Sequence, residues 1–339
     1  MTVDSVFLVG ASISLAALLG TSDAANATAA LISARSGSFL TVAVWSIFWH
    51  ILGGLLAGTA VAETVIRIVQ VKSDLLAPVL ATSCLTSVVF TWIMTQRGIP
   101  ASASVGLVGG LAGAGVVAGG WGSVDWGGIT GWHLVGVVGV LLGILISPII
   151  GSLATALVVR TVRPFTFRLR RKALGRIHLA TWMASAAVAF ADGTNDGQKA
   201  MGIMAVGLSG VGGVFGSGGA GISLGIRIVC ATVLALFTVI SGRKVIVTVS
   251  RGLSKASSIE DLAAQTTSAC VILTAAVVGV PLSTSTVVTA SMVGAGLAGR
   301  RRHIHWRGVV RIVVSWLITV PVCAALSAGF FEIYRTATR

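Results

Sequence analysis

Long apolar runs separated by short polar stretches make up almost all of this chain. An α-helix needs about 20 apolar residues to span a bilayer, and the run from Gly131 to Val159 exceeds that length. Strands of a membrane barrel would be shorter and would alternate in polarity. The predicted passages are 4–33, 38–70, 74–96, 100–120, 129–160, 177–210, 219–242, 259–280, 281–299 and 307–333. The pattern therefore predicts an all-α membrane protein with broken helices, in which the segments after Pro100 and Pro281 are either full passages or re-entrant hairpins.

Composition agrees with this prediction and limits the alternatives. The chain has 339 residues, of which 55% are hydrophobic and 10% are charged, whereas soluble domains carry about 25% charged residues. The 43 glycines suit close helix packing and broken helices in lipid. The first passage lacks the basic start and cleavage site of a signal peptide, so we expect it to be retained. The four cysteines lie singly in apolar segments, which favours packing over metal or disulfide chemistry.

The net charge of +14 would suggest a nucleic-acid partner in a soluble chain, but here the basic residues gather in loops. Basic loops stay on the cytoplasmic side of a membrane. This places the N-terminus outside and the loops inside a cell membrane, with no nucleic acid bound; the central loop also offers contacts to lipid head groups. The clusters are Arg160, Arg163, Arg168, Arg170, Arg171, Lys172 and Arg176; Arg243, Lys244, Arg251 and Lys255; and Arg300, Arg301, Arg302, Arg307 and Arg311.

Two short motifs occur twice, in the same order and at similar separation. "GTSDAANA" from Gly20 matches "GTNDGQKA" from Gly193, and "GIPASAS" from Gly98 matches "GVPLSTS" from Gly279. Five passages in each half is an odd number, so the second half inserts upside down. We expect a first inverted repeat at 1–160, a basic cytoplasmic linker at 161–176 and a second repeat at 177–339. This is the plan of secondary transporters, whose site lies at the repeat interface near the bilayer midplane.

The first repeated motif places charged and amide side chains at the depth of hydrocarbon. An ionised carboxylate there is costly, so it should face the protein interior and be paired. Gly20 and Gly193 would allow the helices to unwind, and unwound carbonyls and carboxylates suit a cation or proton. The residues concerned are Asp23, Asn26, Asp192, Asn195, Asp196, Gln198 and Lys199.

The second repeated motif joins a proline to small hydroxylated residues. Proline suits the first turn of a helix, and a helix N-terminus with added hydroxyl donors is suited to binding an anion. The hydroxyls are those of Ser102, Ser104, Ser283, Thr284 and Ser285. A single serine in a membrane helix more often bonds back to its own helix, so the expectation concerns the set. Together the two motifs predict a site for an oxyanion with cations.

Lys199 and Glu63 leave alternatives open. Lys199 aligns with Asn26, and its ammonium can pair with Asp196 or Asp192, contact the anion, take the place of a metal cation, or extend to an interface. Glu63 is either an interfacial residue or part of the pathway. The histidines show no zinc-binding spacing, and we expect no resident metal and no cofactor.

These motifs resemble those of the inorganic phosphate transporter (Pit) family, which carries two copies of a G-A-N-D-x-x-N-A-like signature. The second copy here, "GTNDGQKAMG", is similar to that of the low-affinity bacterial branch. The resemblance implies uptake of phosphate driven by protons or sodium, partly as a neutral complex with a divalent metal. It implies that Asp23, Asn26, Asn195 and Asp196 ligate cation and substrate and that the five hydroxylated residues hold phosphate.

Departures from the family pattern bear on the coupling ion. Ser22 replaces the usual Asn, Asp192 replaces a His, and Val105 and Thr286 stand where two further histidines are expected. Ser22 and Lys199 weaken a sodium site, so we favour proton coupling, with Asp23, Asn26, Asp192, Asp196 and Gln198 as coupling residues. Asn195 and Lys199 join the hydroxyls as substrate-binding residues. The alternatives are a permease for sulfate or another tetrahedral oxyanion, or an anion channel; an enzyme is not expected, and self-association is left open.

Overall fold

Helices account for nearly all of the chain that the structure describes. The computed structural model describes residues 3–33, 36–97, 101–130, 133–166, 174–215, 221–240, 258–298 and 306–338. Its helices are α1 (Val3–Ser33), α2 (Phe39–Leu56), α3 (Ala60–Arg67), α4 (Ser73–Gln96), α5 (Ala103–Gly119), η1 (Trp121–Ser123), α6 (Gly136–Thr166), α7 (Leu174–Phe215), α8 (Leu224–Ile240), α10 (Ser258–Val278), α11 (Thr284–Ala298) and α12 (Trp306–Ala337). One short antiparallel ribbon pairs β1 (Gly128–Thr130) with β2 (His133–Val135). The predicted all-α fold is confirmed.

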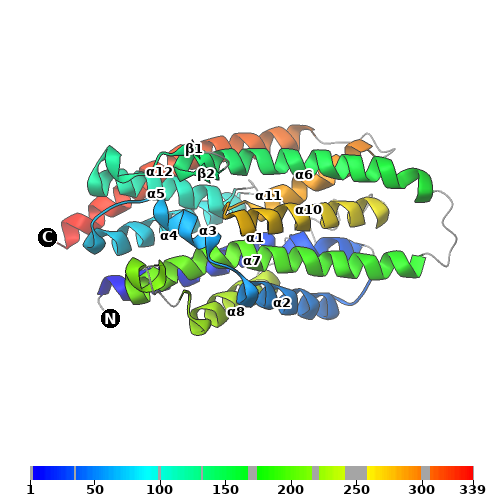
Figure 1. Ribbon diagram of the computed structural model, residues 1–339, viewed down its shortest axis with the longest axis horizontal. Coiled ribbons are helices and arrows are strands. Elements are labelled where there is room, and N and C mark those ends of the chain that lie inside the picture. The colour runs from blue at the N-terminus through cyan, green and yellow to red at the C-terminus, as the bar shows by residue number, and fades with distance from the viewer. Residues whose placement is uncertain are drawn as a thin grey trace.

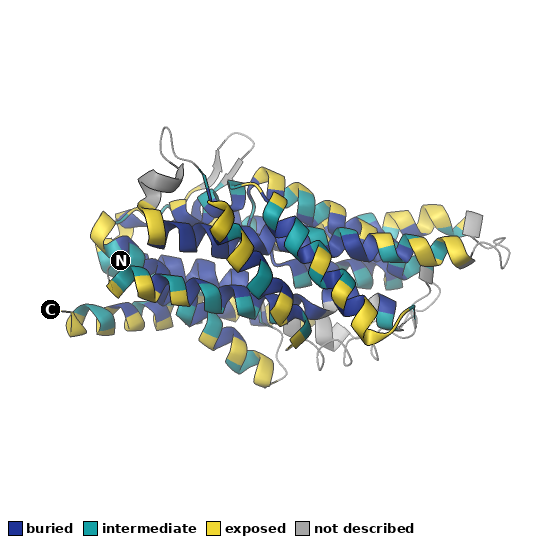
Figure 2. Ribbon diagram, turned by 90° about the horizontal axis from the view of Figure 1, so that it is seen from below, coloured by how far each residue is buried: buried dark blue, intermediate teal, exposed yellow. Residues whose placement is uncertain are grey.

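The helices run roughly along one long axis, and the two chain ends lie at the same end of the bundle (Figure 1). Within the described residues, six helices are long and apolar enough to cross a bilayer. Their outer faces expose large apolar side chains such as Leu153, Leu157 and Leu317, while the buried residues gather where helices cross (Figure 2). An apolar outer surface of this kind suits lipid, so this is a multi-pass membrane protein.

Helices α1 and α7 lie against each other and carry the two copies of the Asp motif. Both are helical through Gly20 and Gly193, so the expected unwinding at these glycines is wrong. A Cβ atom on Gly20 would lie 2.1 Å from the carbonyl oxygen of Leu234 in α8, and one on Gly193 would lie 2.3 Å from that of His50 in α2. The glycines therefore allow close helix approach, which is the main source of helix association in lipid.

The predicted passage 38–70 is broken, and this break was not expected. α2 ends at Leu56 and α3 begins at Ala60. A guanidinium nitrogen of Arg227 in α8 donates to the carbonyls of Leu55 at 3.1 Å and Ala57 at 2.5 Å. Gln198 in α7 accepts from the backbone N–H of Val61 at 2.9 Å. Backbone groups freed inside a membrane need such partners, and here the second half of the chain supplies them.

α4 and α5 form a hairpin whose open end lies beside the start of α6. The N–H of Gln70 donates to the carbonyl of Ser123 at 2.7 Å, so the residues before α4 and after α5 are neighbours. The N–H of Val137 in α6 donates to the carbonyl of Asp125 at 2.8 Å, which fixes the start of α6 at the same place.

α10 and α11 form a second hairpin that opens at the other end of α6. Ala263 and Ala264 near the start of α10 pack in one cluster with Ala295 and Ala298 at the end of α11. Arg163, near the end of α6, donates to the carbonyl of Ala298 at 3.1 Å. The two hairpins therefore enter the bundle from opposite ends and point toward its middle.

The hairpin tips begin their second helices with serine caps rather than with proline. Ser102 precedes α5, and its hydroxyl accepts from the N–H of Val105 at 3.3 Å. In the second hairpin Pro281 lies three residues before α11, and the carbonyl of Ser283 accepts the N–H groups of Thr286 and Val287. The expectation that Pro281 occupies the first helical turn is wrong, and Pro100 lies outside the described residues.

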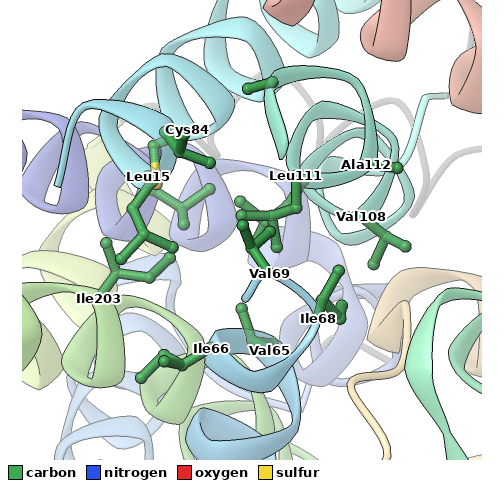
Figure 3. Close-up of a cluster of buried hydrophobic side chains, with 14 of the residues drawn as sticks. Leu15, Val65, Ile66, Ile68, Val69, Cys84, Val108, Leu111, Ala112 and Ile203 are labelled. Atoms are coloured by element: carbon green, nitrogen blue, oxygen red, sulfur yellow. The ribbon is translucent and has the colours of Figure 1, made fainter. Parts of the chain in front are cut away.

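Small and branched apolar side chains fill the interior between the first hairpin, α1, α3 and α7 (Figure 3). Leu15, Ile68, Leu111 and Ile203 are fully or almost fully buried there. Because lipid tails are as apolar as leucine, this packing stabilises the bundle through close contact rather than through removal of water. All four cysteines are free. Cys84, Cys230 and Cys323 are buried, which fits the packing role predicted for them, whereas Cys270 is exposed, so the prediction is wrong for that residue.

Substitution of Gly20 by Ala tests the close approach of α1 to α8. The added Cβ would overlap the Leu234 carbonyl, and overpacking of this kind costs about 1–3 kcal/mol. We expect a lower unfolding temperature in detergent, measured by loss of the monodisperse size-exclusion peak on heating. Gly10→Ala is the matched control, because a Cβ there meets no atom within 4 Å. Equal unfolding temperatures for the two variants would contradict this account.

Candidate functional site

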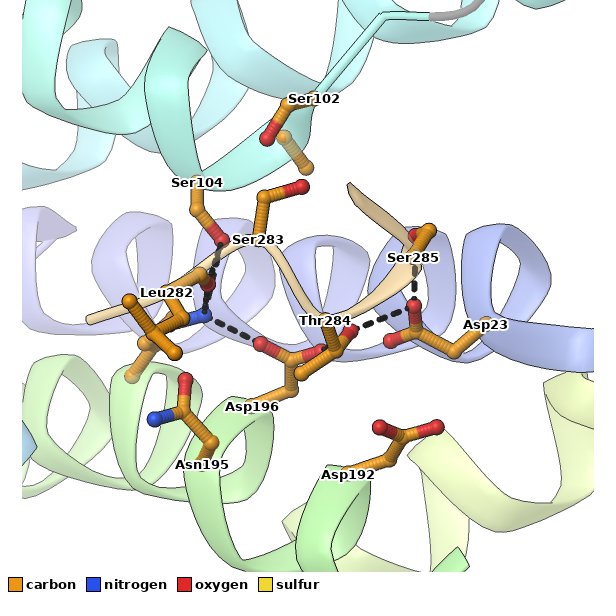
Figure 4. Close-up of polar contacts among 12 residues, drawn as sticks. Asp23, Ser102, Ser104, Asp192, Asn195, Asp196, Leu282, Ser283, Thr284 and Ser285 are labelled. Atoms are coloured by element: carbon orange, nitrogen blue, oxygen red, sulfur yellow. Dashed lines mark hydrogen bonds and ion pairs between the residues drawn. The ribbon is translucent and has the colours of Figure 1, made fainter. Parts of the chain in front are cut away.

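The tips of the two hairpins touch at the centre of the bundle. The hydroxyl of Ser104, in the first turn of α5, donates to the backbone carbonyl of Leu282 at 2.9 Å. Figure 4 shows Ser102 and Ser104 facing Ser283 and Leu282 across this contact, with α1 and α7 on the other side of the second tip. Segments that are 178 residues apart in sequence thus form one surface.

Thr284 connects the two repeated aspartates. Its hydroxyl lies 2.7 Å from Asp23 Oδ1 in α1 and 3.0 Å from Asp196 Oδ2 in α7. Ser285 donates to the same Asp23 oxygen at 2.8 Å. The second hairpin therefore places its hydroxyls directly on both carboxylates (Figure 4).

Asn26 joins a third carboxylate to this pair. Its amide nitrogen donates to Asp23 Oδ1 at 2.9 Å and to Asp192 Oδ2 at 3.1 Å. All three aspartates are buried. This fits the expectation that a carboxylate within a membrane segment faces the protein interior and is paired. Asp23 Oδ2 and Asp192 Oδ1 are buried and have no hydrogen-bond partner among the residues that the structure describes. Two carboxylate oxygens thus remain free to accept a proton or a cation.

Lys199 completes the cluster from α7. Its ammonium forms an ion pair with Asp196, donates to Ser104 Oγ at 2.7 Å and donates to the Leu282 carbonyl at 2.5 Å. The side chain is 1% exposed, so the ammonium has exchanged water for these three oxygens. One residue therefore links α7 to the tips of both hairpins.

A small cavity lies at the meeting point of the two tips, and its volume is about 10 Å³. Room of that size holds about one water molecule. A tetrahedral oxyanion is larger, so the tips must separate before such an ion can enter. The lining residues are Leu19, Ser22, Asp23, Ala101, Ser102, Ala103, Ser104, Asp196, Ser283, Thr284 and Ser285.

The structure brings most of the predicted site residues together, but two lie at its edge. Asn195 donates to the carbonyl of Val280 at 3.1 Å, behind the second tip. Gln198 supports the start of α3 and makes no contact with the carboxylates among the described hydrogen bonds. The hydroxyls of Ser102 and Ser283 line the cavity while also bonding locally, Ser102 to Val105 N and Ser283 to Thr286 Oγ1 at 2.7 Å.

A second hollow, on the outer face of the molecule, is unsuited to an anion. A groove of about 350 Å³ opens on the outer face between α6 and α10, near Ile146, Ile150, Cys270 and Val278. None of the described residues that line it is charged, and anion sites need convergent donors or positive charge. The oxyanion site is therefore expected at the hairpin tips.

Sequence reasoning missed the backbone carbonyl of Leu282 and the support given by Arg227 and α3. A carbonyl leaves no trace in a pattern of side chains, and the helix break at Ala57 carries only the weak signal of Gly58 and Thr59 in an apolar run. Glu63 lies in the first turn of α3, where it accepts from Thr59 at 3.0 Å and approaches Arg67 at 3.9 Å.

Comparison with known proteins identifies the family. The profile described as "Phosphate transporter family" matches residues 19–180 and 169–327. The chain belongs to the phosphate transporter family. A probable low-affinity inorganic phosphate transporter of Mycobacterium bovis is 30% identical over 91% of this chain and 72% of its own length. One of Rhizobium meliloti is 30% identical over 92% of this chain and 90% of its own, and one of Bacillus subtilis is 26% identical over 91% and 90%.

The fold of this chain is shared by a protein of known structure. It is titled "The sodium-dependent phosphate transporter", and it aligns with a TM-score of 0.86 over 99% of this chain and 100% of that one, at 20% identity. The predicted resemblance to the phosphate transporters is thereby confirmed at the level of family and fold.

Thr284→Val tests the bridge between the two aspartates in this transporter. The substitution keeps the shape of the side chain but removes a hydroxyl that lies within hydrogen-bond distance of both carboxylates, and hydrogen bonds to charged groups contribute about 1.5–3 kcal/mol. We expect the initial rate of labelled phosphate uptake to fall by roughly tenfold or more. Thr284→Ser should retain uptake. Thr289→Val makes the same change on the exposed face of α11 and should leave the rate unchanged; a similar loss there would argue against a specific bridge.

Proposed function

We infer that this protein is a secondary active transporter that imports inorganic phosphate together with protons. The observation that carries this proposal is the convergence of three buried carboxylates, one ammonium and a set of hydroxyls at the contact of two opposed hairpin tips. Intramembrane ionisable groups mark ion and substrate pathways, and a site formed where two opposed hairpin tips meet suits coupled transport better than a continuous channel.

The two halves are proposed to be inverted repeats, at 1–160 and 177–339, joined by the basic segment 161–176. Corresponding helices pack in corresponding ways: α1 lies against α8 and α7 against α2, while α5 lies against α12 and α11 against α6. The hairpins that open at opposite ends of α6 follow the same plan. Rocking of one half against the other would then expose a central site to each side in turn.

The phosphate is proposed to bind where the two tips separate. The first turns of α5 and α11 line the cavity, and helix N-termini favour anions. Around them stand the hydroxyls of Ser102, Ser104, Ser283, Thr284 and Ser285. Lys199 offers a positive charge at the rim, and Asn195 positions the second tip from behind through Val280.

The proton is proposed to bind at the group formed by Asp23, Asn26 and Asp192. Three carboxylates face one ammonium, so the cluster is strongly negative when all are ionised, and that is costly at this depth. Neutralising one carboxylate lowers this cost and favours the approach of an anion. Asp196 completes the coupling set through Thr284, and Gln198 supports it through α3.

The orientation is proposed from charge: the N-terminus outside a cell membrane and the basic loops in the cytoplasm. Both chain ends and the open end of the α4–α5 hairpin then face outside (Figure 1). The second basic cluster, Arg300–Arg302 and most of the central loop lie outside the described residues.

Uptake into proteoliposomes with independently varied sodium, pH and divalent metal tests the coupling. We expect labelled phosphate to accumulate without sodium, to follow an inward pH gradient, and to collapse with a protonophore. Strict dependence on sodium would refute proton coupling. Competition by arsenate supports phosphate as substrate, whereas competition by selenate or molybdate would favour a sulfate permease. A stimulation of phosphate uptake that scales with added divalent metal would show that a metal–phosphate complex is transported.

Asp196→Asn tests the role of the central carboxylate. The amide keeps the size of the side chain but removes the charge that pairs with Lys199, so coupled accumulation should fall to background while membrane insertion is preserved. Asp74→Asn at the exposed start of α4 is the matched control and should transport normally. Undiminished accumulation by Asp196→Asn would remove this residue from the mechanism.

A further inference from the structure

The ammonium of Lys199 lies in a set of oxygen ligands typical of a bound inorganic cation. Its three partners are a carboxylate, a hydroxyl and a backbone carbonyl, from Asp196, Ser104 and Leu282. Hard cations such as calcium take these oxygen types at about 2.3–2.6 Å. The carbonyl and hydroxyl lie 2.5 and 2.7 Å from the nitrogen, so the site already has close to the size that a small cation requires.

The same helix position carries a neutral donor in the other copy of the motif. Asn26 follows Asp23 by three residues in α1, and Lys199 follows Asp196 by three residues in α7. Each side chain turns back to its own aspartate and also reaches a second element: Asn26 reaches Asp192, and Lys199 reaches both hairpin tips. At this position the two copies differ in charge, because only the second brings its own positive charge.

We propose that the Lys199 ammonium is a resident counter-cation that takes the place of an inorganic coupling cation at Asp196. This rests on the proposed function as a coupled phosphate transporter. The covalently attached charge keeps Asp196 ionised and paired in every state of the cycle, so no sodium ion is needed there. The residue thereby decides which ion this transporter uses.

The same contacts give Lys199 a second effect on the closed state. Its ammonium bridges the tip that enters from one end of the bundle and the tip that enters from the other, and it does so with the cavity too small for an anion. A side chain tethered to α7 can hold the tips together while the site is empty. An inorganic cation would have to enter with each cycle to do the same.

Lysine suits this place better than arginine. Its ammonium is a compact point charge with three donors on a flexible stem, matching the three oxygens present. The planar guanidinium of arginine needs a wider set of acceptors than the tips leave open.

Substitution of Lys199 by Asn tests the proposal by recreating a vacant cation site with the amide that stands in the first copy. In proteoliposomes we expect sodium-free phosphate uptake by Lys199→Asn to fall by roughly 100-fold, because Asp196 is left buried without its cationic partner. Sodium chloride should restore most of the uptake, whereas choline chloride at equal ionic strength should not. Wild-type uptake should be the same in both salts.

A binding measurement gives a readout that does not depend on transport. A cation that binds the folded state raises the unfolding temperature. We expect sodium, compared with choline, to stabilise purified Lys199→Asn and to leave the wild type unchanged. Lys199→Gln serves as a second variant with a longer amide. Lys72→Asn removes the same charge from the exposed end before α4 and should respond to neither salt.

The outcomes separate the two proposals. If wild-type protein carries phosphate but sodium neither stabilises nor reactivates Lys199→Asn and Lys199→Gln, the ammonium is a substrate ligand or a structural tether and the inference is overturned. The same holds if neither variant folds in either salt, or if sodium stimulates wild type as much as the variants. If the wild type carries no phosphate, the proposed function fails, while the difference in sodium stabilisation still reports on the cation site.

Discussion

The whole arrangement depends on the cost of holding ionised groups in the middle of a bilayer. Three aspartates and one lysine are buried at the centre of the bundle, where each unpaired charge would be strongly destabilising. Each is held by at least one partner from another element, and Thr284, Asn26 and Lys199 supply the links. The fold therefore has to bring four helices, α1, α5, α7 and α11, to one point.

Close contacts between helix backbones bring these elements together at the site. Gly20 and Gly193 allow α1 and α7 to approach the carbonyls of α8 and α2 more closely than any side chain would permit. The interruption between α2 and α3 is held by Arg227 from one side and by Gln198 from the other. Each half of the chain thus supports helices of the other half. The geometry of the central site therefore depends on how the surrounding helices pack.

The contact between the two hairpin tips at the centre of the bundle suits a transporter that works by alternating access. The tips of the hairpins hold each other directly and through Lys199, and the space between them is smaller than any tetrahedral oxyanion. Entry of the anion must replace these contacts with contacts of comparable strength. The hydroxyls and helix N-termini around the cavity can supply them, so opening and binding become one event.

The sequence by itself determined the membrane class, the approximate bounds of most apolar segments, and the two motifs that meet at the site, because composition, length and repetition are properties of the chain. It also pointed to Asp23, Asp196 and the hydroxyls of both tips. Only the tertiary structure decided that α1 and α7 stay helical through their glycines, that the passage 38–70 is broken, and that Lys199 reaches the Leu282 carbonyl. These features depend on which backbone lies opposite a residue. In the sequence, a glycine that lets a helix unwind cannot be distinguished from one that lets two helices approach closely.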